Sequence, residues 1–225
     1  MNQKLCFIFL ALFFYKLHLF AQKNLTIHFT PTYHDVAIQM HQPFFNRENS
    51  DTIELTTLKF YISAIQLYYQ NQVCWTESNS YHLVDIENND SISLDLPSNV
   101  LYDKLSFQLG VDSVTNVSGA MDGSLDPLKG MYWTWQSGYI NFKLEAAESS
   151  GDKIIYHLGG YNGAQNSLQK LQFLINPNHT TFYCNLNLKS IFSATNLSHT
   201  KHLMTPGTDA VNLLHNIALD ITLEP

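Results

Sequence analysis

Histidine and tryptophan are the residue types of this sequence whose spacing suggests chemistry. The 225-residue chain has ten histidines and three tryptophans. Trp133 and Trp135 lie together in GMYWTWQSGYINFKLE (130–145), and His157 follows in IIYHLGGY (154–161). Imidazole nitrogens bind copper and zinc, whereas an intact indole offers only an N–H donor. His157 is therefore a candidate metal ligand, and the tryptophan pair requires an explanation.

The strand pattern around His157 predicts a half-buried imidazole. His157 shares a strand face with Ile155 and alternates with Tyr156 and Leu158, which are expected in the core. A buried imidazole needs hydrogen bonds or a metal. For a second ligand we favour His28, because strand alternation turns it away from Ile27. The other candidates lie ahead of the last predicted helix: His199 and His202.

Motifs of common enzymes are absent from the sequence. It has no G-x-S-x-G, H-E-x-x-H, G-x-G-x-x-G or phosphate-binding loop. We therefore expect a protein that is not an enzyme.

The polar segment GVDSVTNVSGAMDGSLDPLKG (110–130) carries three aspartates, Asp112, Asp122 and Asp126. Carboxylates of this kind can hold calcium, but their spacing matches no EF-hand. Asp-Gly and Asp-Pro are also turn formers, and we favour that role over calcium.

The N-terminal stretch MNQKLCFIFLALFFYKLHLFA has the layout of a signal peptide. Lys16 and His18 interrupt its apolar run, which is too short to span a bilayer. We expect residues 1–21 to be cleaved, leaving one domain, 22–225, in the periplasm or outside the cell. That domain has ten basic and 19 acidic residues, a formal charge of −9. Such a charge disfavours nucleic acid or anionic lipid as a partner.

Period-two alternation of apolar residues predicts a mainly β, β-sandwich-like domain. The alternating segments begin at Leu25, Ile53, Leu58, Ile92, Leu105, Ile140 and Leu219. The segments that begin at Ile53 and Leu58 differ in phase across Thr56-Thr57. We expect one or two short helices, the clearest in TPGTDAVNLLHNIA (205–218), with Thr208 as its N-cap. The segment 167–175 fits helix or strand.

The strand after the tryptophan pair changes phase. Trp133 and Trp135 occupy odd positions, whereas Ile140, Phe142 and Leu144 occupy even ones. This flip predicts a β-bulge at Ser137-Gly138.

Cys74 and Cys184 remain after processing. Either they pair in an oxidising compartment or both are free core thiols.

The segment LDPLKGMYWTWQSGYINFKLE followed by YHLGG resembles the methanobactin-associated copper-binding proteins (the MbnP-like domain), whose pattern is W-x-W-x-x-G-Y and, a strand later, H-L-G. The resemblance covers nearly all of residues 22–225. It implies an extracytoplasmic copper binder in which a tryptophan, oxidised to kynurenine by a dihaem peroxidase-like protein, holds copper with histidine imidazoles. Carried over, Trp133 or Trp135 is the oxidised residue and His157 a ligand.

The implied chemistry agrees with the ligand types. Opening the indole exposes an aromatic amine and a ketone, which with imidazole suit copper. A non-catalytic binding module is the alternative, in which an aromatic platform stacks on carbohydrate or a protein partner. Its members would be Tyr132, Trp133, Trp135, Tyr139 and Tyr161. A purely structural role for the tryptophans is the third interpretation.

Overall fold

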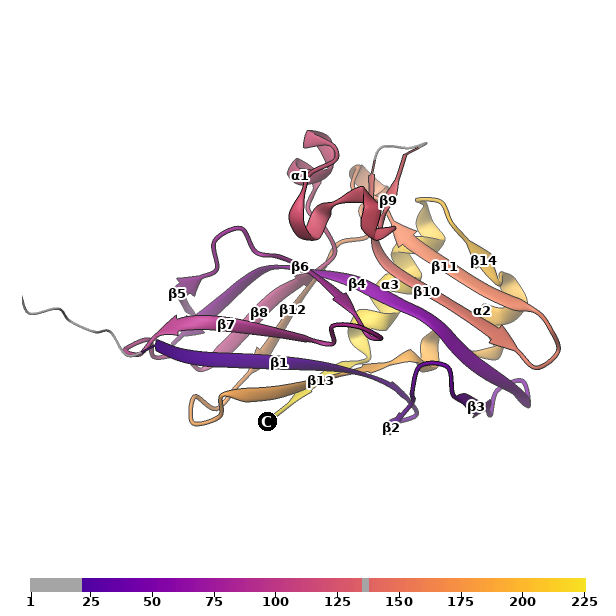
Figure 1. Ribbon diagram of the computed structural model, residues 1–225, viewed down its shortest axis with the longest axis horizontal. Coiled ribbons are helices and arrows are strands. Elements are labelled where there is room, and N and C mark those ends of the chain that lie inside the picture. The colour runs from indigo at the N-terminus through magenta and orange to yellow at the C-terminus, as the bar shows by residue number, and fades with distance from the viewer. Residues whose placement is uncertain (1–21, 135–137) are drawn as a thin grey trace, which may run out of the picture.

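Two β-sheets packed face to face form most of the protein (Figure 1). The structure, a computed structural model, describes residues 22–134 and 138–225. The predicted signal peptide, residues 1–21, and Trp135 lie outside the described residues. Within the described ranges, no helix is long and apolar enough to cross a membrane.

The smaller sheet has the strand order β15-β13-β1-β2, with β7 paired to the first half of β1. Its strands are β1 (Gln22–Tyr33), β2 (Val36–Ala37), β7 (Ser91–Pro97), β13 (Thr181–Asn187) and β15 (Ile221–Glu224). The central pair, β1 and β13, is parallel, and the other pairings are antiparallel.

The larger sheet has the order β12-β8-β4-β10-β11-β14, with shorter strands paired to β4 and β10. Its strands are β3 (Pro43–Asn46), β4 (Asp51–Tyr69), β5 (Gln72–Thr76), β6 (Tyr81–Asp85), β8 (Lys104–Leu109), β9 (Tyr132–Trp133), β10 (Gly138–Glu148), β11 (Lys153–Gly159), β12 (Gln169–Leu174) and β14 (His202–Leu203). The segment 167–175, whose sequence fits either helix or strand, contains strand β12.

Helices are short and few, as predicted. They are α1 (Ser113–Ser118), α2 (Ala194–His199) and α3 (Thr208–Leu219), with 3₁₀ turns η1 (Gly123–Leu125), η2 (Pro127–Lys129), η3 (Gly163–Gln165) and η4 (Leu188–Ser190). The mainly β class and the helix near the C-terminus are confirmed. Gly207, rather than Thr208, is the N-cap of α3, and Leu219 ends that helix instead of beginning a strand.

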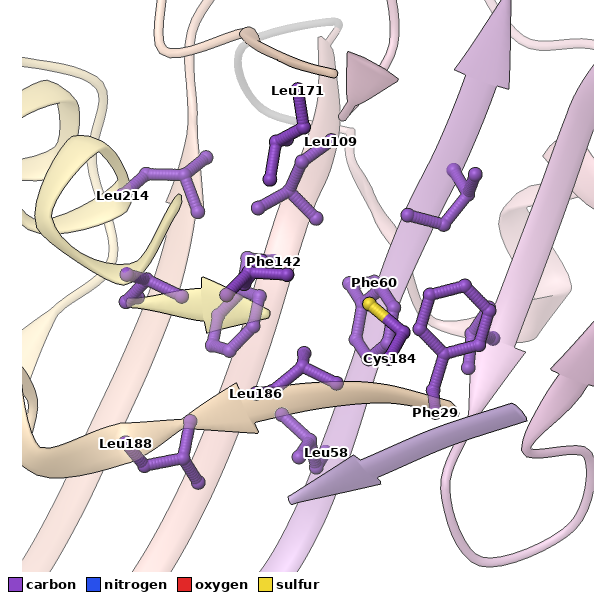
Figure 2. Packing of buried hydrophobic residues seen from close by; sticks show 14 of the residues in the cluster. Phe29, Leu58, Phe60, Leu109, Phe142, Leu171, Cys184, Leu186, Leu188 and Leu214 are labelled. Atoms are coloured by element: carbon purple, nitrogen blue, oxygen red, sulfur yellow. The ribbon is translucent and has the colours of Figure 1, made fainter. Parts of the chain in front are cut away.

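The main core lies between the two sheets (Figure 2). Phe29 of the smaller sheet meets Phe60 of the larger one, with ring centroids 5.4 Å apart. Phe60 stacks on Phe142 of the neighbouring strand at 5.9 Å. Cys184 is buried in this core and Cys74 is exposed on β5, so the two described cysteines are free and the disulfide does not form.

A second, smaller core lies on the outer face of the larger sheet. Phe60 and Ile62 point into the main core, so Tyr61 between them points the other way. Its companions are Val111, Leu125, Met131, Trp133, Tyr139 and Ile140. The segment that carries α1, η1, η2 and β9 lies over this face (Figure 1).

The bulge in β10 lies at Asn141, three residues beyond the predicted position. Trp133 and Gly138 belong to two paired antiparallel strands, β9 and β10, so the single strand predicted over residues 133–144 is wrong. The register of β10 against β11 shifts between Ile140 and Phe142. Ile140 therefore faces the second core and Phe142 the main core, and their predicted common face is wrong.

Hydrogen bonds explain the position of this bulge. The Asn141 side chain is fully buried; its Oδ1 accepts from the Val111 N–H at 2.9 Å, and its Nδ2 donates to Ser167 Oγ at 2.9 Å. Ser137 of the predicted bulge lies outside the described residues.

Candidate metal centre

The six-membered ring of Trp133 lies against the backbone of β11. A Cβ atom built on Gly159 would lie 2.8 Å from Cζ3 and 3.0 Å from Cη2 of Trp133. Such a contact leaves no room for any side chain larger than that of glycine. Trp133 is only 5% exposed. The H-L-G motif thus provides the surface on which the first tryptophan of W-x-W rests.

His157 lies two residues before Gly159 on β11. Residues two apart on a strand share a face, and Tyr156 and Leu158 on the other face are in the main core. The imidazole and the Trp133 ring are thus on the same outer face of β11. His157 is 8% exposed, which makes it more buried than the half-buried position that the sequence predicted.

Glu145 is the hydrogen-bond partner of His157. Its Oε1 is 2.8 Å from Nε2 of His157 and 3.4 Å from Nζ of Lys143. Burial lowers the pKa of His157 below 6.5, although Glu145 acts in the opposite direction. Burial opposes ionisation of Glu145, but hydrogen bonds from His157 and the charge of Lys143 outweigh it and lower the Glu145 pKa. At neutral pH the site holds a neutral imidazole, which is the form that binds metals.

His28, the favoured second ligand, lies on the smaller sheet. It is opposite Tyr183 of β13 in the strand register, and the two rings stack at 5.5 Å. Its neighbours Ile27 and Phe29 are in the main core, so His28 points to the outer face of that sheet. The structure thus places His28 and His157 on opposite outer faces of the sandwich and does not bring them together.

His199 and His202 have partners of their own. His199 ends α2, with Nε2 3.3 Å from Oδ2 of Asp209. His202 lies on β14, the strand next to β11, which carries His157. In the register of these two strands, His202 is opposite Ile155. Its Nε2, however, is 3.0 Å from the Lys153 carbonyl oxygen, on the side of Ile155 away from His157. Both imidazoles are exposed.

No group of three or more His, Cys, Asp or Glu side chains is arranged to hold a metal among residues 22–134 and 138–225. Two of the three aspartates considered for calcium form helix caps instead. Asp112 accepts from the Thr115 N–H at 2.9 Å, and Asp126 accepts from the Leu128 N–H at 2.9 Å. Asp126, which precedes Pro127, has the turn-forming role that we favoured, and Asp112 caps α1.

A cavity of about 120 Å³ adjoins Trp133. Its other lining residues are Gly138, Gly160, Tyr161, Asn162, Gln165 and Pro206. Gly160 has φ +122°, and a Cβ there would lie 2.2 Å from the Gln165 carbonyl oxygen, so the turn requires glycine. The amides of Asn162 and Gln165 were not among the predicted site residues. The double glycine Gly159-Gly160 is the signal in the sequence that marks this close approach.

Two of the five residues of the predicted aromatic platform, Trp133 and Tyr139, are buried; Tyr132 and Tyr161 are half-buried, and Trp135 lies outside the described residues. Tyr139 is 1% exposed and meets Tyr132 at a centroid distance of 4.9 Å. With Trp133 also buried, these rings pack into the second core. The buried faces of Trp133 and Tyr139 are not available for stacking on a sugar.

Comparison with known proteins places this geometry in a family. A profile of MbnP matches residues 22–208. The chain belongs to the MbnP family. A solved structure, MbnP from Methylosinus trichosporium, has the same fold, with a TM-score of 0.60 and 16% sequence identity over 85% of this chain and 87% of that one. No curated protein matches the sequence. The resemblance inferred from W-x-W-x-x-G-Y and H-L-G is confirmed.

Proposed function

We propose that this MbnP-family protein is an extracytoplasmic copper-binding protein that serves copper acquisition or homeostasis. In this proposal, His157 and the oxidised form of Trp133 hold the metal. The observation that carries it is the common outer face of β11, where the Trp133 ring rests on Gly159 two residues from a buried, neutral His157. The predicted signal peptide, residues 1–21, supports the extracytoplasmic location.

The residues fit copper once Trp133 is oxidised. An intact indole supplies no lone pair, and His157 alone is too few ligands. Kynurenine adds an amine nitrogen and a ketone oxygen, and Cu²⁺ binds such nitrogen-containing sites more tightly than the other divalent first-row metals. Asn162 and Gln165 line the adjoining cavity, and side-chain amides of this type supply oxygen donors. A site completed by oxidation agrees with the lack of a three-ligand group among the described residues.

Oxidation of the indole requires a partner. The protein supplies no oxidant of its own, and the family resemblance implies a dihaem peroxidase-like protein in this role. We propose that this partner acts on Trp133, because the Trp133 ring rests on Gly159, two residues from His157 on the same face of β11.

Copper titration of protein produced with and without the dihaem protein tests the proposal. We expect stoichiometric, tight binding only after coproduction, and binding at least tenfold weaker in His157→Ala. His179→Ala is the matched control, because His179 is exposed and lies outside the candidate centre. Equal loss in both variants, or no copper bound by the coproduced wild type, would sink the proposal.

A further inference from the structure

We propose that Glu145 is a positioning residue that holds His157 in its Nε2–H tautomer and leaves Nδ1 as the metal-binding nitrogen. The metal part of this inference rests on the proposed function above. The tautomer does not, because it follows from the protein's own contacts.

Strand register brings the two side chains together. On paired strands β10 and β11, His157 is opposite Lys143 and Glu145 is opposite Ile155. Glu145 and His157 are therefore diagonal neighbours on the same face, and diagonal neighbours are within reach of long side chains. The measured separation of Oε1 and Nε2, 2.8 Å, is a full hydrogen bond.

The hydrogen-bonding capacities of the carboxylate and the imidazole then determine which nitrogen of His157 carries the proton. An ionised carboxylate only accepts hydrogen bonds, so the nitrogen that faces it must carry the hydrogen. A neutral imidazole has one N–H, and with that hydrogen on Nε2 the lone pair is on Nδ1. A carboxylate behind a metal-binding histidine fixes both the tautomer and the ring orientation, and it makes the ligand more basic.

The carboxylate is itself held in place. The ammonium of Lys143 is 3.4 Å from the same Oε1 that faces His157. The backbone of Glu145 is held separately: the Thr56 hydroxyl donates to the backbone carbonyl oxygen of Glu145 at 3.0 Å, where β4 and β10 shift register. The side chain of Glu145 is 34% exposed, so a polar substitution there need not disrupt the core.

Nitrogen-15 NMR of the metal-free protein tests the tautomer directly. With labelled histidine, long-range proton–nitrogen correlations distinguish Nε2–H from Nδ1–H for each ring. We expect a single Nε2–H pattern for His157 in the wild type and a mixture of tautomers in Glu145→Ala. Glu145→Gln should restore most of the Nε2–H pattern, because its amide oxygen accepts the same bond.

Glu77→Gln is the control, since it alters another 2.8 Å carboxylate–imidazole pair, with His82, on a different strand. It should leave the His157 signals unchanged. An Nδ1–H pattern for His157 in the wild type, or identical His157 signals in wild type and Glu145→Ala, would overturn the inference.

Copper binding by protein produced together with the dihaem protein tests the second half of the inference, that Nδ1 of His157 binds the metal. We expect Glu145→Ala to weaken binding 10–100-fold and Glu145→Gln to recover most of it. In pulsed electron paramagnetic resonance, the remote nitrogen of His157 should be a protonated Nε2. Loss of an oxygen ligand in both variants would show that Glu145 binds copper itself and would contradict the positioning role. The Nε2–H tautomer in a protein that binds no copper would refute the proposed function while leaving the tautomer established.

Discussion

The ring of Trp133 and the backbone of Gly159 touch so closely that a methyl group between them would lie 2.8 Å from Cζ3. This contact joins the two sequence motifs of the family at one point. Because Gly159 is two residues from His157 on β11, the indole and the imidazole lie on the same face of that strand.

Gly159→Ala should displace Trp133. The added methyl would also lie 2.6 Å from the Tyr139 carbonyl oxygen, which is backbone and cannot easily move. We expect a loss of about 1–3 kcal/mol in the free energy of unfolding, typical of overpacking. Urea titration measures this, and tryptophan fluorescence should shift to longer wavelength. In Gly207→Ala the methyl meets no atom within 4 Å, so an equal loss there would refute the explanation.

Asn141→Ala should destabilise the bulge. It removes the acceptor of the buried Val111 N–H and the donor to Ser167, both at 2.9 Å. Unsatisfied buried groups and the lost packing should cost about 2–4 kcal/mol, measured by urea unfolding. Asn178→Ala, at an exposed position, should change stability by less than about 0.5 kcal/mol. A neutral Asn141→Ala would show that the bulge does not depend on these bonds.

Stability should fall in acid partly through Asp85. Burial opposes its ionisation, but the hydrogen bonds from Lys59, 2.9 Å away, from the Asn88 side chain and from the Glu87 N–H outweigh burial and lower its pKa below 3.8. Since the unfolded state then takes up the proton more readily, this contribution is present above about pH 4 and disappears as the pH falls through the folded-state pKa.

Thermal unfolding of Asp85→Asn from pH 7 to pH 3 checks this assignment. We expect a loss of about 1–2 kcal/mol at pH 7 that shrinks as the pH falls. The control Asp95→Asn makes the same charge change at an exposed position of β7. A gap between wild type and Asp85→Asn that stays constant with pH would contradict the linkage.

Thiol labelling should distinguish the two described cysteines. Cys74 is exposed and Cys184 is fully buried. Local burial raises the pKa of the Cys74 thiol above 9.0, so its labelling should accelerate toward alkaline pH. In the processed chain we expect one thiol to react in the folded protein and two in urea. No reaction in urea without reductant would reveal a disulfide instead.

Strand alternation predicted much of the architecture because it reports which residues face the core. The phase change at Thr56-Thr57 appears as a register shift of β4 against β10. His28 and His157 both turn away from the main core as the pattern indicates. What alternation does not report is the sheet to which each strand belongs, and for that reason His28 was expected near His157.

The second core was missed for a different physical reason. Its members come from three separated segments, and the loop residues Val111, Leu125 and Met131 show no period. Long-range packing of this kind leaves no local signal. The bulge at Asn141 depends on Val111 and Ser167, which are 30 and 26 residues away in the sequence, so no local pattern predicts it.

The most direct test of the central claim is the mass of the peptide that contains Trp133 and Trp135. Protein coproduced with the dihaem protein is digested so that Trp133 and Trp135 are located by fragment ions. Conversion of tryptophan to kynurenine removes one carbon and adds one oxygen, a change of about +4 Da. We predict this change on Trp133, together with bound copper, and neither in Trp133→Phe. A change of about +4 Da on Trp135 with Trp133 intact, or copper bound tightly with both tryptophans intact, would contradict the claim.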